Sequence, residues 1–583
     1  MKNISILILT IVIITSCDLS KYKITKEYDL STTFEKSNGE ETGTYKEVID
    51  FYTQLDDAFT TIQMKKVGIT DSGEPLHLVV YDPESNFDWS AIHKNKTVLL
   101  INNGIHPGES DGIDATMIML RKFAQDSLKA PKNTVIATIP IYNVGGALNR
   151  NSTSRTNQNG PKEYGFRGNA RNYDLNRDFI KMDSKNAFAF AEIFHQVNPD
   201  VFIDNHVSNG ADYQYTLTHL LTQHNRLGGS LGKYLKENLM IQLEDSLAVK
   251  GIPITPYVNV FNEVPEKGFS QFLDTPRYST GYTTLWNTLG LMIETHMLKP
   301  YQQRVESTYE LMTTCIDIIE NSEGRIKKLR AENQKYFEDS KFYPINYAVN
   351  KDTLTTIDFQ GYEAEKLKSE VTQLSRLKYN KEKPFHKEVS YYDYFQAKDS
   401  ISIPKAYVIP QGWWAIKDRL LANKIDFETL EKDSLMEVEV YRIKNFETSS
   451  TPYEGHYLHK NTSVTASVKR VKFRKGDMIV PTHQAGMRYL LETLEPSAVD
   501  SFFNWNFFDT ILQQKEGFSP YVFEDIALSF LKENPSVKKA FEDKKAKDKA
   551  FRNNWYAQLD WIHKKSPNYE KAHLVYPVFR MLN

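Results

Sequence analysis

The sequence predicts an α/β fold in the first half of the chain, followed by a small all-β module and a helical C-terminal region. Between Thr44 and Ile319, short apolar segments typical of buried strands alternate with longer segments of helical periodicity. Residues 385–482 are instead rich in tyrosine and alternate apolar with polar side chains, which is typical of strands. Helical patterns return after residue 483. Strands that alternate with helices indicate a sheet covered by helices on both faces.

Each element is predicted from its own pattern. The strands expected in the first half are Leu76–Tyr81, Thr97–Asn102, Thr134–Ile141, Val201–Asn205 and Leu289–Glu294. The helices expected there are Gly112–Gln125, Lys185–Val197, Leu227–Lys250 and Gln302–Glu320. In the second half, strands are expected within Val389–Phe395, Met436–Ile443 and Ser463–Phe473, and helices within Arg488–Leu494, Tyr521–Glu533 and Val537–Arg552.

Length, charge and cysteine content exclude several classes of protein. The chain has 583 residues, which favours two or three domains over one. Its 72 basic and 74 acidic residues leave a formal net charge of −2, without the excess of positive charge typical of a general nucleic-acid binder. Two cysteines exclude a disulfide-stapled scaffold and a cysteine-rich zinc or iron–sulfur site.

The first seventeen residues have the features of an export signal. Lys2 precedes the apolar run Ile4–Ile14, which is too short to cross a membrane as an ordinary helix. Cys17 follows two small polar residues, a placement that resembles the lipobox of bacterial lipoproteins. That resemblance implies an exported protein of the cell envelope, at the periplasm or the cell surface, anchored in the membrane by a lipid on Cys17. In the alternative, a plain signal is cleaved and Cys17 is incidental.

If Cys17 is lipidated, Cys315 is the only remaining thiol. It lies among apolar residues at helical spacing, so a buried, unreactive core cysteine is expected. The predicted organisation is a signal peptide at 1–17, a polar tether at 18–43, an α/β domain at 44–322, a connector at 323–384, a β module at 385–482 and a mostly helical region at 483–583.

Three side chains could form a metal site at strand ends. His106 and Glu109 lie three residues apart in a turn after the strand Thr97–Asn102, where open α/β sheets place their ligand sites. Such a pair alone is weak evidence, because it also occurs by chance on surfaces. His206 offers a third ligand at the end of the next apolar strand, with Asp204 placed to orient its imidazole. Two histidines and one carboxylate leave one open position, as in catalytic zinc sites.

Two further segments place polar groups beside predicted strands or loops. Asn176 and Arg177 lie between aspartates and could equally form a helix cap with a surface ion pair. Glu294 ends a strand that otherwise looks wholly buried, where a charge costs several kcal/mol unless it is paired or functional. Each feature alone is more often structural, but their joint occurrence indicates one site.

The order HPGE (106–109), DLNRDF (174–179), IDNH (203–206) and MIETH (292–296) resembles the M14 family of zinc metallocarboxypeptidases. The segment VGITDSGEPLHLVVY (67–81) also resembles the opening hairpin of those domains. The resemblance covers roughly residues 44–322 and implies a carboxypeptidase-like domain with a mixed sheet of about eight strands. It also implies one Zn²⁺ per chain and hydrolysis of the C-terminal bond of a peptide that has a free C-terminal carboxylate.

Carried over by position, the resemblance implies a role for each motif residue. The implied zinc ligands are His106, Glu109 and His206, the implied carboxylate binders are Asn176 and Arg177, and the implied general base is Glu294. Arg167 is expected to stabilise the oxyanion, with Arg155 and Arg171 as competitors. Tyr278 is expected to close over the substrate, in preference to Tyr282.

The sequence departs from the digestive members of the family at Pro107 and Gly108, where it is closer to the cytosolic carboxypeptidase subgroup. The extension of about 260 residues after Asn321 has no counterpart in the family's core pattern. One alternative function is a zinc amidohydrolase or peptidase acting on peptidoglycan stem peptides or acylated amino acids. Another is a catalytically silent binding lipoprotein, which the complete set of His106, Glu109, His206 and Glu294 argues against.

Overall fold

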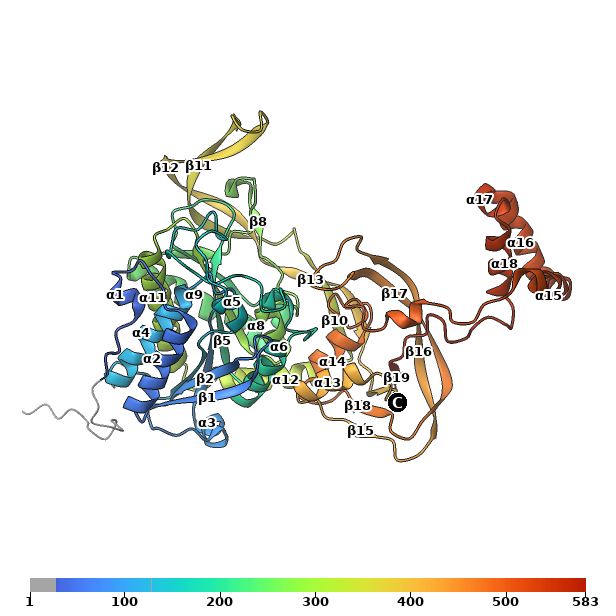
Figure 1. Ribbon diagram of the computed structural model, residues 1–583, viewed down its shortest axis with the longest axis horizontal. Coiled ribbons are helices and arrows are strands. Elements are labelled where there is room, and N and C mark those ends of the chain that lie inside the picture. The colour runs from blue at the N-terminus through green and yellow to red at the C-terminus, as the bar shows by residue number, and fades with distance from the viewer. Residues whose placement is uncertain (1–27, 127, 583) are drawn as a thin grey trace, which may run out of the picture. The chain divides into compact units, whose positions relative to one another are not determined.

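The computed structural model describes residues 28–126 and 128–582, which form two compact units (Figure 1). The first unit extends to Ile401 and includes 419–424 and 485–489, and the second comprises the other residues from Ser402 on. The expected signal peptide, Cys17 and tether residues 18–27 lie outside the described residues. Within the described part, no helix combines the length and apolar character that a membrane span requires.

A mixed eight-stranded sheet forms the centre of the first unit, which confirms the predicted fold class. Its strand order is β1-β2-β4-β3-β5-β9-β6-β7. The strands are β1 (Ile62–Ile69), β2 (Pro75–Tyr81), β3 (Thr97–Asn102), β4 (Thr134–Ile139), β5 (Val201–Ser208), β6 (Leu217–Leu221), β7 (Ile254–Pro256) and β9 (Leu289–His296). The central strands β4, β3, β5 and β9 are parallel, and every residue of β3 and β5 is buried. Burial on both faces explains why these strands read as continuous apolar runs.

Helices cover both faces of this sheet (Figure 1). α4 and α11 pack together on one face, and α6 and α10 pack on the other. The helices of this region are α1 (Thr33–Lys36), α2 (Tyr45–Ala58), α3 (Trp89–Asn95), α4 (Asp111–Gln125), α5 (Val144–Leu148), η2 (Leu175–Arg177), α6 (Lys185–Val197), α7 (His224–Leu227), α8 (Gly229–Tyr234), η3 (Leu235–Leu239), α9 (Met240–Val249), η4 (Pro265–Lys267), α10 (Ser279–Thr284), α11 (Tyr301–Glu320) and α12 (Arg325–Glu338).

Local sequence signals account for the helix ends. The Ser184 side chain accepts a hydrogen bond from the Ala187 amide at the start of α6, and Asn198 ends that helix in the left-handed conformation. Thr44 and Glu47 form a capping box at the start of α2. Cys315 is buried in α11, and burial raises the pKa of its thiol to about 12, which leaves it unreactive as expected.

Residues 28–43, expected as part of a polar tether, belong instead to the folded unit. Leu30 and Phe34 are buried in the main core, and Arg121 of α4 forms an ion pair with Glu35. The segment is polar on average, but these two apolar side chains pack into the core and hold the short helix α1 against it. The folded unit therefore begins before Thr44.

The region expected as a connector is mainly β-structure. After α12 come β10 (Phe342–Val349), β11 (Thr355–Lys368), β12 (Ser375–Tyr392) and β13 (Phe395–Ser402). The expected boundary at residue 384 falls inside β12. β11 and β12 form a long antiparallel hairpin that projects from the rest of the first unit (Figure 1). Near the end of β12, the hairpin is hydrogen-bonded to the short strand β8 (Phe269–Ser270). The many charged residues on these largely exposed strands obscured their pattern in the sequence.

The second unit contains a six-stranded sheet of order β15-β18-β14-β19-β16-β17 and a group of helices with its own apolar core. The elements after β13 are β14 (Ala406–Ile409), α13 (Trp414–Ala422), β15 (Glu428–Thr429), β16 (Ser434–Thr448), β17 (His459–Phe473), β18 (Met478–Pro481), α14 (Met487–Leu494), η5 (Asp509–Leu512), α15 (Pro520–Glu533), α16 (Pro535–Lys547), α17 (Lys549–Arg552), α18 (Trp555–His563) and β19 (Phe579–Met581). The β module thus takes its last strand from the end of the chain.

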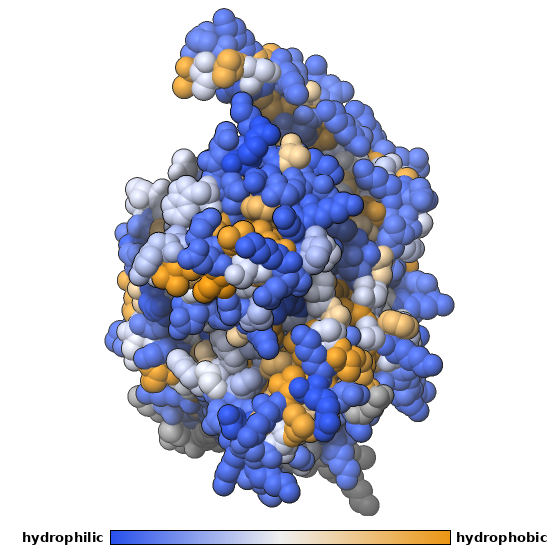
Figure 2. All heavy atoms as spheres, turned by 90° about the vertical axis from the view of Figure 1, so that its right-hand side faces the viewer, coloured by the Kyte–Doolittle hydropathy of each residue, from blue (hydrophilic) through white to orange (hydrophobic). Residues whose placement is uncertain are grey.

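The face drawn in Figure 2 is mainly hydrophilic, with hydrophobic residues in separate patches.

Candidate metal centre and substrate pocket

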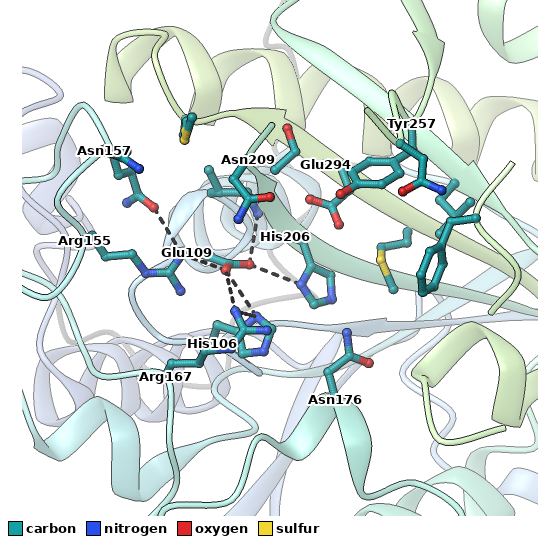
Figure 3. A pocket seen from close by; sticks show the side chains of 18 of the residues that line it. His106, Glu109, Arg155, Asn157, Arg167, Asn176, His206, Asn209, Tyr257 and Glu294 are labelled. Carbon is teal, nitrogen blue, oxygen red and sulfur yellow. Dashed lines mark hydrogen bonds and ion pairs between the residues drawn. The ribbon is translucent and has the colours of Figure 1, made fainter. Parts of the chain in front are cut away.

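Three predicted ligands meet at the carboxyl ends of β3 and β5. Nδ1 of His106 lies 3.2 Å from Oε1 of Glu109, and Nδ1 of His206 lies 3.1 Å from Oε2 of the same carboxylate. One ligand atom from each residue lies within 4.8 Å of the others, and all three side chains are buried. The two imidazoles and the carboxylate therefore converge on a single point (Figure 3).

The turn that carries His106 and Glu109 depends on close packing at Gly108. The Glu109 amide donates a hydrogen bond to the His106 carbonyl oxygen, which closes the turn. A Cβ atom on Gly108 would lie 2.7 Å from Nε of Arg155 and 2.9 Å from the carbonyl oxygen of Gly165. Glycine at position 108 thus lets the loop that carries Arg155 approach the metal site, which gives a physical reason for the HPGE form of the motif.

Two outer carboxylates orient the imidazoles. Asp174 lies 2.9 Å from Nε2 of His106, and Asp204 lies 2.9 Å from Nε2 of His206. Each carboxylate favours a proton on Nε2, so each imidazole presents Nδ1 toward Glu109 as a metal donor. Burial lowers the pKa of His206, but Asp204 and Glu109 outweigh it and hold that pKa well above its ordinary value. The same negative charges that favour a proton on His206 also favour binding of a metal cation.

The Glu109 side chain stays ionised despite its burial. Burial raises its pKa, but the charges of Arg155 and His106 and the hydrogen bonds from both histidines hold that pKa well below the ordinary value. The backbone amide of Val207 also donates to Oε2 at 3.0 Å. Two imidazoles, each of which would give up its Nδ1 proton to a bound metal, and one ionised carboxylate are a donor set that fits zinc.

Glu294 lies beside the three ligands because of strand register. In the parallel pair of β5 and β9, His206 is the partner of Glu294, so their side chains leave the same face of the sheet. Burial, together with the charges of Glu109 and Asp204, raises the pKa of Glu294 to about 8, although His206 and Arg167 oppose the shift. A carboxyl group in this state can exchange a proton near neutral pH.

The predicted carboxylate binders and Tyr278 line the same pocket. The Asn176 side-chain oxygen accepts a hydrogen bond from the Ser279 amide, which ties η2 to the start of α10. The guanidinium of Arg177 lies over the Tyr278 ring, 4.5 Å from its centroid. Tyr282 lies elsewhere: its ring is buried in the core and its hydroxyl donates to Asn423.

The three candidate arginines have different surroundings. Arg155 and Arg167 line the pocket, whereas Arg171 donates to the backbone oxygen of Asp183 and is not among the lining residues. Nε and Nη2 of Arg167 both contact Oδ2 of Asp174, at 3.0 and 2.8 Å. Arg167 is thus engaged in holding the carboxylate that orients His106.

The two terminal nitrogens of the Arg155 guanidinium have different surroundings. Its Nη1 lies 2.7 Å from Oε1 of Glu109, while its Nη2 is buried without a hydrogen-bond partner among the described residues. A buried guanidinium nitrogen that lacks a partner costs free energy unless a ligand supplies an acceptor. Arg167 also has a nitrogen at this centre, because its Nη1 lies 3.4 Å from Nδ1 of His106 and 3.7 Å from Oε1 of Glu109.

The pocket has a volume of about 490 Å³. Figure 3 shows Arg155 and Asn157 on one side of the three ligands, Tyr257, Glu294 and Asn176 on the other, and Asn209 above Glu109 between them. The sequence reading missed the lining residues Asn157, Gln158, Asn209, Tyr257, Asn259, Phe261 and Phe272, together with Leu220 and Met292 of the sheet. Most of them lie in long loops without periodicity, so no sequence signal singled them out.

The chain was compared with protein-family models, curated sequences and solved structures, and only the solved structures gave matches. No protein-family model matches the chain, and no curated protein sequence matches it. Among solved structures, it is similar to a metallo-carboxypeptidase from Burkholderia cenocepacia (15% identity, TM-score 0.35, 47% of this chain and 68% of that one). It is also similar to carboxypeptidase A from Helicoverpa armigera (12% identity, TM-score 0.36, 48% and 75%). These structures are metallocarboxypeptidases. The likeness covers about half of this chain.

Proposed function

We propose that this chain is a zinc-dependent metallocarboxypeptidase that hydrolyses the C-terminal peptide bond of peptides. The observation that carries the proposal is the convergence of His106, Glu109 and His206 on one point, with Glu294 beside them and Arg177 in the same pocket. A metal-binding set, a carboxyl group of raised pKa and a guanidinium together supply what metal-dependent removal of a C-terminal residue needs.

His106, Glu109 and His206 would hold one zinc ion. Zinc bound by three protein ligands supplies an acidified water and polarises a carbonyl group. Asp174 and Asp204 keep the two imidazoles in the tautomer and orientation that such binding needs. The contact between Arg155 and Glu109 compensates part of the buried negative charge at this centre.

Glu294 acts as the proton carrier of the reaction. It accepts a proton as water attacks the scissile carbonyl and donates it to the leaving amine. A nearby cation favours the ionised carboxylate, so loading of the site brings the pKa of Glu294 below its metal-free value of about 8. The residue then starts the cycle as a base and ends it as an acid.

Asn176 and Arg177 give the enzyme its preference for chain ends. A guanidinium can bind a carboxylate through two parallel hydrogen bonds, which a peptide bond inside a chain does not offer. Stacking of Arg177 on Tyr278 aligns its plane in the pocket. Tyr278 covers the bound residue, and the unpaired nitrogen of Arg155 donates to the oxyanion, a role for which Arg167 is the second candidate.

We further propose that the protein is exported and held in the cell envelope by a lipid on Cys17. The support is the order of Lys2, the apolar run and Cys17 in the sequence. The Cys17→Ser variant should leave the membrane fraction of the producing cells while retaining peptidase activity. An unchanged distribution would favour the plain cleaved signal.

The decisive experiment is a mass-spectrometric digest of peptides with and without a chelator. We expect loss of single residues from the C-terminus, abolished by the chelator and restored by zinc. The same peptides with an amidated C-terminus are the matched control and should resist, because Arg177 then lacks a carboxylate partner. Internal cuts would indicate an endopeptidase, and cleavage of muropeptides or acylated amino acids alone would indicate an amidohydrolase. Absence of hydrolysis for every substrate would overturn the enzyme assignment.

A further inference from the structure

The wall of the pocket opposite Arg155 is the segment 257–261, which has two faces. Tyr257, Asn259 and Phe261 line the pocket, whereas the residues between them, Val258 and Val260, are buried in a separate apolar cluster. The segment is not a regular strand: the Asn259 amide donates to the Tyr257 carbonyl oxygen and the Val260 amide donates to the Val258 carbonyl oxygen, as in γ-turns. Whatever holds Val258 and Val260 therefore also sets the direction of the three pocket residues.

The β11–β12 hairpin supplies much of that cluster. Phe359 of β11 and Val389 and Tyr391 of β12 pack with Val258 and Val260. Phe359 is fully buried, and its ring contacts Tyr213, Tyr215 and Phe269 at centroid distances of 5.7 to 6.2 Å. Residues 257–261 are not part of a strand, and two backbone hydrogen bonds join the segment to its neighbours, from the Tyr257 amide to the His219 carbonyl oxygen and from the Ala211 amide to the Val260 carbonyl oxygen. Beneath the segment, its support is the packing against the hairpin.

Hydrogen bonds join the hairpin to both loops that border the pocket. The Gln214 side chain donates to the backbone oxygens of Gly361 and Phe385, at 2.9 and 3.0 Å. The Tyr215 hydroxyl donates to the Asp358 carbonyl oxygen at 3.0 Å. Gln214 and Tyr215 follow Asn209, which lines the pocket.

The second loop is joined in the same way. The Tyr379 hydroxyl donates to the backbone oxygen of Glu263 at 2.9 Å, two residues beyond Phe261. β12 pairs in parallel with β8, with Tyr391 opposite Phe269. Phe272, which lines the pocket, comes two residues after that strand.

We propose that the β11–β12 hairpin is the positioning element of the substrate pocket, with Phe359 and Tyr379 as its positioning residues. This inference rests on the proposed peptidase function for its kinetic consequence. The site then requires residues 355–392, which come after the expected end of the α/β domain at residue 322. The hairpin acts on substrate fit through the 257–261 wall and leaves the proposed metal ligands in place, because these lie in the turn after β3 and on β5.

Two variants test the proposal in the full-length protein. Tyr379→Phe removes the hydrogen bond to Glu263, two residues beyond the wall, and Phe359→Leu reduces packing beneath the wall. Because each variant loosens the wall without removing it, we expect KM for a peptide substrate to rise about five- to tenfold. We expect kcat and the zinc content per chain to stay within about twofold, and amide hydrogen exchange to accelerate at 257–272.

The controls are Phe51→Leu, a buried phenylalanine of α2 in the main core, and Tyr45→Phe, whose hydroxyl also donates to a backbone oxygen. Both should leave KM and exchange at 257–272 unchanged. An unchanged KM, or loss of zinc in parallel with kcat, would overturn the proposal. If the wild type hydrolyses no peptide, the proposed function fails by itself, and the exchange comparison still decides whether the hairpin positions the wall.

Discussion

His206 and Glu294 are register partners on the neighbouring parallel strands β5 and β9. The next residues down the same face are Asp204 on β5 and Met292 on β9. On the other side of β9, Thr218 of β6 lies opposite Glu294 and Leu220 lies opposite Met292. One row of the sheet thus carries a candidate metal ligand and the proposed acid–base group. The row beneath carries an orienting carboxylate and two apolar side chains.

Glu294→Gln should abolish peptidase activity without loss of metal. The amide keeps the shape of the carboxyl group but cannot accept and return a proton, so kcat/KM should fall about 10²- to 10⁴-fold. Zinc per chain, measured by elemental analysis, should be unchanged because Glu294 is not among the ligands. Glu310→Gln, which alters an exposed ion pair with Lys250, is the control and should be fully active. Full zinc-dependent activity of Glu294→Gln would contradict the mechanism.

Asp204→Asn should weaken zinc binding. The Asp204 carboxylate accepts hydrogen bonds from Nε2 of His206, the Ser279 hydroxyl and the Asn102 amide. Removal of its charge lowers the basicity of His206, so we expect zinc affinity to fall about 10- to 100-fold in chelator competition. Asp50→Asn, at an exposed ion pair with Lys46, should bind zinc as the wild type does. Equal affinities for the two variants would argue against an orienting role for Asp204.

The apolar row beneath Glu294 should set the preference for the last residue of the substrate. Leu220 and Met292 are buried at the pocket floor, so we expect peptides ending in apolar residues to be cleaved faster than those ending in Lys or Glu. Leu220→Asp should shift the ratio of kcat/KM values toward basic C-terminal residues by about tenfold or more. Leu128→Asp, at an exposed position, is the control. An unaltered preference in Leu220→Asp would exclude this floor from substrate recognition.

Asp114 should make folding stability depend on pH. Burial and the neighbouring Asp111 raise the pKa of Asp114 to about 7, although the Tyr301 hydroxyl donates to it. The unfolded chain loses this proton near pH 4, whereas the folded protein keeps it to about pH 7. Between these values the unfolded state binds fewer protons, so the free energy of unfolding should fall as pH rises. Denaturant titrations across this range should show the fall in wild type and in the surface variant Asp50→Asn, but a smaller one in Asp114→Asn.

Much of the site could be predicted because its chemistry is carried by short motifs at strand ends. β3 and α6 have the predicted bounds, and the apolar runs before His106 and His206 are buried central strands as expected. The contents of the second half were harder to predict. β11 and β12 carry many charged residues because most of the hairpin is exposed, and exposure removes the alternation that marks a half-buried strand.

The sequence by itself determined which residue types are available for metal binding and proton transfer, since His106, Glu109, His206 and Glu294 each follow or end an apolar strand. Only the tertiary structure decided what surrounds them. The choice among Arg155, Arg167 and Arg171 depends on which hydrogen bonds each makes across loops far apart in the chain. The pocket wall at 257–261 likewise takes its direction from Phe359, about a hundred residues later. The local sequences around these side chains allow each of them to enter the pocket. Packing between segments that are distant in the chain decides which of them do, and this cannot be inferred from local sequence patterns.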